Sequence, residues 1–468
     1  MNYLVIDSGT SSTKAFLFNA NGIVIHSNKI KHQLIRPKKF HVECDANSIL
    51  NACQILFRSM LKISGDTPII DTGLAVQRST FLFWEKESCR PISPALSWQD
   101  NRAQSIIDNF SKHANTLWYK TGTPLSAHFG GPKFSHMIHN DTKLKDAIKN
   151  NDVYFGPLSA FLSQAITGTP GIDESIACRS LLYNIHTRDW SSFALDVFEV
   201  SKECLPPIVP VYYNYGTLFD TDIPLSIVIG DQQSALIGQA GLNTAIAGNL
   251  GTSGSLQFNA GKKPIIIPGL ISSLLYSDNH NEYYMVEGTI NACNSLFHHL
   301  ETELNIPHNK MIWDKRVSQV TTNGIFIPGF SGLAAPYWTA GFDDIYIDLK
   351  KTSNNNEIIR AGMESIAFLI NDIYQCLMKS INMQPIIINI AGGAARKPLL
   401  QFIADIIEVS VGYSSMKDRT AYGVYILLNP EYKFNTLENI DRVFNPNPTK
   451  IIYLKKQKWA NTIANLIK

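Results

Sequence analysis

One short turn, rich in glycine and hydroxyl residues, occurs twice in the chain. The first copy, at residues 7–14, reads DSGTSSTK, and the second, at residues 249–255, reads NLGTSGS. Apolar residues precede each copy and a β-rich run follows it, which predicts a strand, a tight turn and a second strand. The backbone N–H groups of such a turn form a concavity that binds anions, above all phosphate. Two copies therefore indicate two similar half-folds that face one polyphosphate.

A third glycine turn, Gly392-Gly393-Ala394, follows the apolar run at residues 386–390. One such turn alone is more typical of an ordinary hairpin, because glycine and hydroxyl residues favour turns in any protein. Three of them at strand ends favour a bound nucleotide. Asp7 then suits a water-mediated ligand of Mg²⁺, which needs only one or two carboxylates. Lys14 either neutralises a phosphate or is a solvated strand residue.

Asp231 is a second carboxylate at the end of a predicted strand. It follows a predicted buried strand at residues 225–229, and α/β proteins gather their chemistry at the carboxyl ends of strands. On local grounds a helix N-cap explains this aspartate equally well. An arginine such as Arg78 forks to hydroxyls or carboxylates, and a tryptophan such as Trp98 stacks on a sugar. A surface ion pair and a core tryptophan are the simpler interpretations of those two residues alone.

Strands and helices alternate along both halves of the chain. Strands are predicted at residues 3–6, 13–18, 23–26, 69–76, 81–84, 225–229, 324–327 and 386–390. Helices are predicted at 45–63, from the 97–102 cluster to about 110, at 143–149, 157–166 and 234–240, from 288 to about 304, at 357–381, from about 398, and at 419–428. This alternation predicts α/β domains, and the two halves are expected to meet near residues 240–248.

Composition and charge argue against several classes of protein. The 468 residues are 45% hydrophobic and 17% charged, and the net charge is +2, so no bias toward nucleic acid or an anionic membrane follows. Neither a signal peptide nor a spanning helix is predicted, because no apolar leader or sufficiently long apolar run occurs. The seven cysteines include no CxxC pair, which disfavours a disulfide framework or a zinc site and fits a reducing cytoplasm. His298 and His299 are expected to be structural, without an acidic partner at ligand spacing.

With these residues in view, the chain resembles the FGGY carbohydrate kinases, the family of glycerol kinase and xylulokinase. The resemblance runs almost end to end, and its most specific part is GDQQSALIGQ at residues 230–239. The other matching motifs are DSGTS at 7–11, VECD at 42–45, QRST at 77–80, SWQDNR at 97–102, TG at 167–168, NIHTRDW at 184–190, GTS at 251–253, EG at 287–288, PGFSGLAAPYW at 328–338, ESIA at 364–367 and GGA at 392–394.

The resemblance implies an α/β fold of two actin-like (ribonuclease H-like) ATPase domains, at residues 1–242 and 243–468, with ATP and a sugar in an interdomain cleft. It implies that Asp231 is the general base and that Asp7 holds Mg²⁺ through water. The residues that would line the phosphates are Thr10, Ser11 and Lys14 from the first domain and Gly251 and Thr252 from the second. Those that would border the adenosine are Gly392, Gly393 and Ala394. Those that would hold the substrate are Arg78, Trp98, Asp231 and Gln232.

Three positions depart from the glycerol kinases of this family. Glycerol kinases carry an acidic residue where this chain has Ser79, an aromatic residue at the position of Ser255, and a tyrosine at that of His128. The Met-His pair that xylulokinases carry near residues 77–78 is absent too. The prediction is therefore an ATP-dependent kinase of a small sugar or polyol, with ketoses and alditols both left open.

Two other interpretations are weighed against this kinase. One is a catalytically silent homologue that senses sugar or nucleotide, which the retention of Asp7, Asp231 and both phosphate turns disfavours. The other is a different actin-like ATPase such as a chaperone, which the sugar-side motif around Trp98 and Gln232 disfavours. The expected setting is the cytoplasm. The expected partner is a small-molecule substrate, with no nucleic acid and no membrane, and a homodimer is left open.

Overall fold

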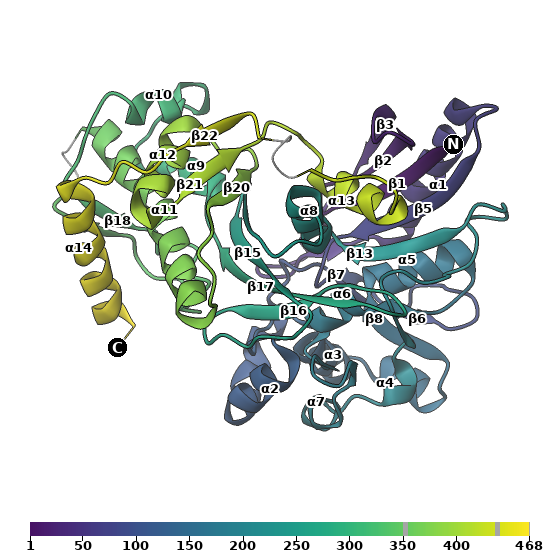
Figure 1. The fold of residues 1–468 in the computed structure, drawn as a ribbon. Coiled ribbons are helices and arrows are strands. Elements are labelled where there is room, and N and C mark those ends of the chain that lie inside the picture. The colour runs from purple at the N-terminus through teal and green to yellow at the C-terminus, as the bar shows by residue number, and fades with distance from the viewer. Residues whose placement is uncertain (350–353, 436–439, 468) are drawn as a thin grey trace.

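Two large β-sheets organise the computed structural model, which describes residues 1–349, 354–435 and 440–467 (Figure 1). The first sheet has the strand order β13-β5-β1-β2-β3. Its strands are β1 (Asn2–Ser8), β2 (Ser12–Asn19), β3 (Val24–Lys31), β5 (Ile69–Val76) and β13 (Leu225–Gly230). The helices packed on it are α1 (Ala46–Ser64), α5 (Leu158–Thr167), α8 (Asp231–Ala240) and α13 (Arg419–Leu428).

The second sheet repeats the central plan of the first. Its order is β16-β17-β15-β14-β20-β21-β22. Its strands are β14 (Ile246–Leu250), β15 (Gly254–Gly261), β16 (Ile271–Ser277), β17 (Glu282–Ile290), β20 (Ile387–Ala391), β21 (Ser410–Tyr413) and β22 (Arg442–Phe444). The helices of this half are α9 (Asn294–Glu303), α10 (Trp313–Val317), α11 (Asn355–Ser380), α12 (Lys397–Ile407) and α14 (Lys450–Leu466), with the small pair β18 (Ile325–Ile327) and β19 (Ile345–Ile347).

A smaller four-stranded sheet has the order β4-β7-β6-β8, and its strands β6, β7 and β8 come from the segment between β5 and β13. Its strands are β4 (Glu43–Cys44), β6 (Phe81–Glu85), β7 (Ala95–Leu96) and β8 (Val153–Pro157). The same region holds η1 (Arg102–His113), α2 (Ala114–Thr121), α3 (Gly130–Asn140), α4 (Thr142–Lys149), β9 (Ile172–Asp173), α6 (Glu174–Ala177), η2 (Cys178–Ser180), β10 (Tyr183–Asn184), β11 (Asp189–Trp190), α7 (Ser192–Phe198), η3 (Lys202–Cys204) and β12 (Ile208–Val209).

The predicted hairpins are confirmed in both large sheets. In the first, Asp7 pairs with Lys14 and Ser8 with Thr13, which leaves the glycine turn between β1 and β2. In the second, Leu250 pairs with Gly254, which leaves a turn at residues 251–253. Each turn thus lies at the carboxyl end of a central strand.

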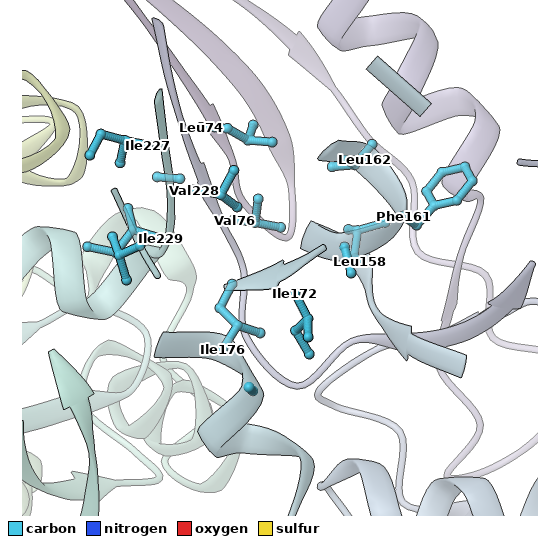
Figure 2. Packing of buried hydrophobic residues seen from close by; sticks show 14 of the residues in the cluster. Leu74, Val76, Leu158, Phe161, Leu162, Ile172, Ile176, Ile227, Val228 and Ile229 are labelled. Carbon is cyan, nitrogen blue, oxygen red and sulfur yellow. The ribbon is translucent and has the colours of Figure 1, made fainter. Parts of the chain in front are cut away.

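The parallel strands β5 and β13 are covered by helices on both faces, and this packing holds the ends of the strands in place. On one face, Leu74 and Val76 of β5 lie toward Leu158 and Leu162 of α5 (Figure 2). On the other face, a Cβ added at Gly73 would lie 2.2 Å from Val424 of α13. Because dense packing on both faces resists displacement, side chains that follow these strands are held on a rigid base.

Helix α13 comes from the last part of the chain but packs on the first sheet, against α8, β1 and β5 (Figure 1). The two helices cross at backbone contact: a Cβ added at Gly423 would lie 1.9 Å from the carbonyl oxygen of Ser234. The Ser234 hydroxyl donates to the Thr420 carbonyl oxygen at 2.7 Å. Glycine at this position permits a close approach that any side chain would prevent. The domain boundary at 242/243 stays a prediction.

Two helix predictions were wrong in part. Residues 282–290 form strand β17, and only Asn294–Glu303 is helical; the run EYYMVEGTI is rich in the aromatic and β-branched residues that favour strands. Residues Arg102–His113 form a 3₁₀ helix, in which Ala103 is the buried residue. With so little apolar surface to bury, this segment lacks the packing that stabilises most α-helices. Among the described residues, no helix has the length and apolar composition that a membrane crossing requires.

Candidate active site

Three adjacent strands of the first sheet end at the same level and bring Asp7, Arg78 and Asp231 to one edge. Strands β1, β5 and β13 are parallel, with Ser8 level with Val76 and Val76 level with Gly230. Asp7 is the penultimate residue of β1, Arg78 lies two residues beyond β5, and Asp231 follows β13 directly. The sequence predicted each of these residues separately, and the sheet topology brings them together.

Asp231 is not the cap of α8. Gly230 occupies the N-cap position, and Asp231 is the first helical residue. Its Oδ1 accepts a hydrogen bond from the N–H of Gln232 at 2.7 Å and lies 3.8 Å from Nε of Arg78. Burial raises the pKa of this carboxyl group, and Arg78 opposes the rise. A carboxylate with a raised pKa that remains 24% exposed has the properties of a general base.

Arg78 is held in place by a carboxylate from the second sheet. Its Nη1 lies 3.1 Å from Oε1 of Glu287, and its Nη2 donates to Oε2 at 3.2 Å. Glu287 is fully buried and is also paired with Arg179. Burial alone would raise the pKa of Glu287, but Arg179 and Arg78 outweigh it and hold the pKa at about 2. No role for Glu287 was predicted from the sequence, where it lies within the EG motif at 287–288, and no local pattern indicated Arg179.

The first glycine turn adjoins a residue predicted to contact the substrate. The indole Nε1 of Trp98 donates to Oγ1 of Thr10 at 2.9 Å. The turn is closed by a hydrogen bond from Gly9 N–H to the Ser12 carbonyl oxygen at 3.0 Å, and the Ser11 carbonyl oxygen accepts from His32 N–H at 2.8 Å. A residue predicted to contact the phosphates and one predicted to contact the substrate are therefore in direct contact.

Lys14 pairs with a carboxylate instead of projecting into solvent. Its Nζ lies 2.6 Å from Oδ1 of Asp418, the residue before α13. Asp7 is close to both groups. Burial raises the pKa of Asp7 to about 7, while Lys14 lowers it and the carboxylates of Asp231 and Asp418 raise it. Asp7 therefore lacks a full counter-charge, and a cation would supply one.

The second and third glycine turns meet at one edge of the second sheet. Strand β20 is parallel to β14, with Asn249 level with Ala391. Ala394 N–H donates to the Leu250 carbonyl oxygen at 2.8 Å. Gly392 has a φ of +109°, and a Cβ there would lie 2.3 Å from that same oxygen. Gly251 and Gly392–Ala394 are thus neighbours, as a shared nucleotide would require.

The segments that carry the predicted substrate residues Arg78 and Trp98 are joined by a lysine that was not predicted from the sequence. Lys133 of α3 is fully buried, and its Nζ donates to the carbonyl oxygens of Ser79 and Ser97, each at 2.7 Å. It thereby joins the segment after Arg78 to the segment before Trp98. Burial lowers the pKa of Lys133 to about 7. Only its side-chain contacts identify it, because a lysine in a helical stretch is usually solvated.

Three further positions singled out in the sequence have defined surroundings in the structure. Nδ1 of His128 is 2.9 Å from the Trp98 carbonyl oxygen. The Gln232 carbonyl oxygen accepts from Nε2 of Gln257 at 3.4 Å. Ser255 is buried in β15, beside Gly254 at the second turn. In the described parts of the chain, no hydrogen bond or ion pair joins the first turn to Gly251 or Gly392 directly, so their common nucleotide stays a prediction.

Family models match nearly the whole chain. Residues 2–238 match the N-terminal domain of the FGGY family of carbohydrate kinases, and residues 246–429 match its C-terminal domain. Curated relatives include a glycerol kinase from Natranaerobius thermophilus, 30% identical over 95% of this chain and 94% of the relative. Another is glycerol kinase 1 from Thermotoga maritima, 30% identical over 94% and 93%.

Solved structures are similar over the same extent. A Plasmodium falciparum glycerol kinase with ADP has a TM-score of 0.91 at 27% identity, covering 99% of this chain and 98% of that one. A gluconate kinase from Lactobacillus acidophilus has a TM-score of 0.88 at 21% identity, covering 100% and 99%, and indicates the fold alone. These likenesses confirm the predicted α/β fold of two actin-like domains.

Proposed function

Because the chain belongs to the FGGY family of carbohydrate kinases, we propose that it transfers the γ-phosphate of ATP to a hydroxyl of a small polyol, with Asp231 as the general base. The observation that carries this proposal is the placement of Asp231 and Arg78 at neighbouring strand ends, beside the first glycine turn. Curated relatives over almost the whole length are glycerol kinases, so glycerol is the first acceptor to test.

The proposed reaction is an in-line transfer. The acceptor hydroxyl gives its proton to Asp231 while its oxygen bonds to the γ-phosphorus, and the bond from that phosphorus to the bridging oxygen of ADP breaks. Arg78 orients the acceptor, and Trp98 and Gln232 complete its binding site. Enzymes of this kind act mainly by positioning the reactants and neutralising charge, which fits an arginine fixed by two bonds to Glu287.

The phosphates and the cation have candidate ligands at the same edge of the sheets. Thr10, Ser11 and Lys14 would contact the phosphates from the first half and Gly251 and Thr252 from the second, with Gly392, Gly393 and Ala394 around the adenosine. Asp7 would hold Mg²⁺ through water, and bound Mg²⁺ supplies positive charge that offsets the charge of the phosphates. The incomplete counter-charge at Asp7, whose lysine neighbour is engaged by Asp418, fits that role.

A coupled assay of ADP release tests the proposal with glycerol, erythritol, ribulose, xylulose and sedoheptulose. Turnover of an alditol supports a polyol kinase. Turnover of a ketose alone would show that the acceptor is a ketose and not an alditol. The departures from glycerol kinases at Ser79, His128 and Ser255 make this a specific alternative. Binding of ATP without turnover of any acceptor favours the silent sensor instead, and calorimetry with ATP separates that outcome from loss of nucleotide binding.

A further inference from the structure

Three side chains of metal-binding type meet at the last turn of α9, outside the proposed active site. His298 and Glu301 lie one helical turn apart on α9, and His308 begins η4 (His308–Lys310). Nδ1 of His308 is 2.9 Å from Oε1 of Glu301, and Nδ1 of His298 is 3.3 Å from Oε2. One ligand atom from each of the three residues lies within 4.8 Å of the others.

The expectation that His298 and His299 have no acidic partner was therefore wrong, because Glu301 faces His298 and Asp344 faces His299. Residues three apart on a helix share a face, which places Glu301 beside His298. Two bonds then reverse the chain: Asn305 N–H donates to the Thr302 carbonyl oxygen at 3.2 Å, and Ile306 N–H donates to the Glu301 carbonyl oxygen at 2.8 Å. This reversal brings in His308, whose ring stacks on that of His298 with centroids 5.3 Å apart.

The neighbouring His299 shows what a structural histidine looks like in the same helix. Its Nε2 lies 2.5 Å from Oδ2 of Asp344, and its ring stacks on Phe330 with centroids 4.0 Å apart. By contrast, the side chains of His298 and His308 are 59% and 76% exposed, and both point a nitrogen at one carboxylate. Their exposure leaves the cluster accessible to an ion from solvent.

We propose that His298, Glu301 and His308 form a binding site for a divalent transition-metal ion of the Zn²⁺ type. Zinc bonds of 2.0–2.2 Å to two imidazole nitrogens and one carboxylate oxygen place tetrahedral ligands about 3.3 Å apart. Oε2 of Glu301 lies 3.0 Å from Nδ1 of His308 and 3.3 Å from Nδ1 of His298, close to that value, and one ligand atom from each of the three residues lies within 4.8 Å of the others. Nitrogen ligands select zinc, nickel or copper over Mg²⁺, so this site differs in chemistry from the one assigned to Asp7. Water completes the coordination.

Isothermal titration of the full-length protein with ZnCl₂, in excess Mg²⁺, tests the site. We expect a zinc isotherm in which His298→Ala and His308→Ala each weaken the affinity by at least about tenfold, because each removes one of three ligands. His280→Ala, an exposed histidine outside the cluster, is the matched control and should bind as the wild type does. Melting curves without metal should be the same for all variants, because both ligand histidines are exposed.

Hydrogen exchange supplies a second readout. Zinc should slow amide exchange at residues 305–310 in the wild type and leave it unchanged in His308→Ala, because the ion ties η4 to α9. No zinc binding to the wild type overturns the site, and so does binding that the double variant His298→Ala/His308→Ala retains in full. Both results are independent of the phosphoryl-transfer assay.

Discussion

The guanidinium group of Arg78 and the carboxylate of Glu287 join the two large sheets at the candidate active site. Arg78 follows β5 of the first sheet and Glu287 lies in β17 of the second, and they are 209 positions apart in the sequence. Their closest contact is 3.1 Å, and the Glu287 side chain is fully buried. Because Arg179 shares the same carboxylate, the direction in which Arg78 points depends on the position of the other sheet.

Replacing Glu287 by glutamine should weaken both acceptor binding and stability. The variant keeps the shape of the side chain but removes the buried carboxylate that Arg78 and Arg179 share, and breaking a buried pair costs about 3–5 kcal/mol. We expect the KM for the acceptor to rise at least about tenfold and Tm to fall. The matched control is Glu282→Gln on the same strand, whose pair with Arg188 is exposed and worth no more than about 1 kcal/mol. A Glu287→Gln enzyme that behaves like this control would show that Arg78 does not depend on Glu287.

Asp231→Asn should abolish most turnover while leaving nucleotide binding intact. Asparagine has the same shape but cannot accept the proton of the acceptor hydroxyl, and loss of a general base lowers kcat by roughly 10²–10⁴-fold. Steady-state kinetics measure the loss, and a fluorescence titration with ATP checks the binding. Asp189→Asn, at an exposed site, serves as the control. Turnover near that of the wild type in Asp231→Asn would remove Asp231 from the mechanism.

The pH profile should report the environment of Asp231. The base acts only as a carboxylate, so kcat/KM should fall as the pH drops through its pKa. Burial raises this pKa and Arg78 opposes the rise. The acid limb of the profile, where kcat/KM falls with decreasing pH, should therefore lie above the usual pKa of aspartate, about 3.9.

Arg78→Met removes the opposing charge and should move the acid limb to higher pH, whereas Arg78→Lys keeps the charge and should move it less. Profiles measured at several acceptor concentrations separate this shift from the loss of binding that both variants share. A limb that moves to lower pH in Arg78→Met would contradict the assignment of Asp231 as the titrating base.

Local signals explain what could be predicted from the sequence. The glycine turns and the aspartates at strand ends depend on residues a few positions apart, and the hairpins at Asp7–Lys14 and Asn249–Ser255 were confirmed. The bond between Arg78 and Glu287 depends on how two sheets pack, which no local pattern encodes. Strand β17 was missed because residues 284–288 of its EYYMVEGTI run are buried in succession, so the run lacks the apolar–polar alternation that identifies a half-exposed strand.

Lys133→Met should damage the acceptor site through the backbone. Methionine fills the volume of the lysine stem but supplies no donor, so the carbonyl oxygens of Ser79 and Ser97 lose their bonds to Nζ. Each buried group left unpaired costs about 1–3 kcal/mol. We therefore expect a lower Tm and a raised KM for the acceptor, with the KM for ATP little changed because the glycine turns are held by other bonds.

The matched control is Lys143→Met on α4, which replaces an exposed lysine and should alter stability by no more than about 0.5 kcal/mol. A residue that positions only Arg78 and Trp98 would leave nucleotide binding unchanged. An equal rise of the KM for ATP and the KM for the acceptor would therefore show that Lys133 supports the whole fold instead.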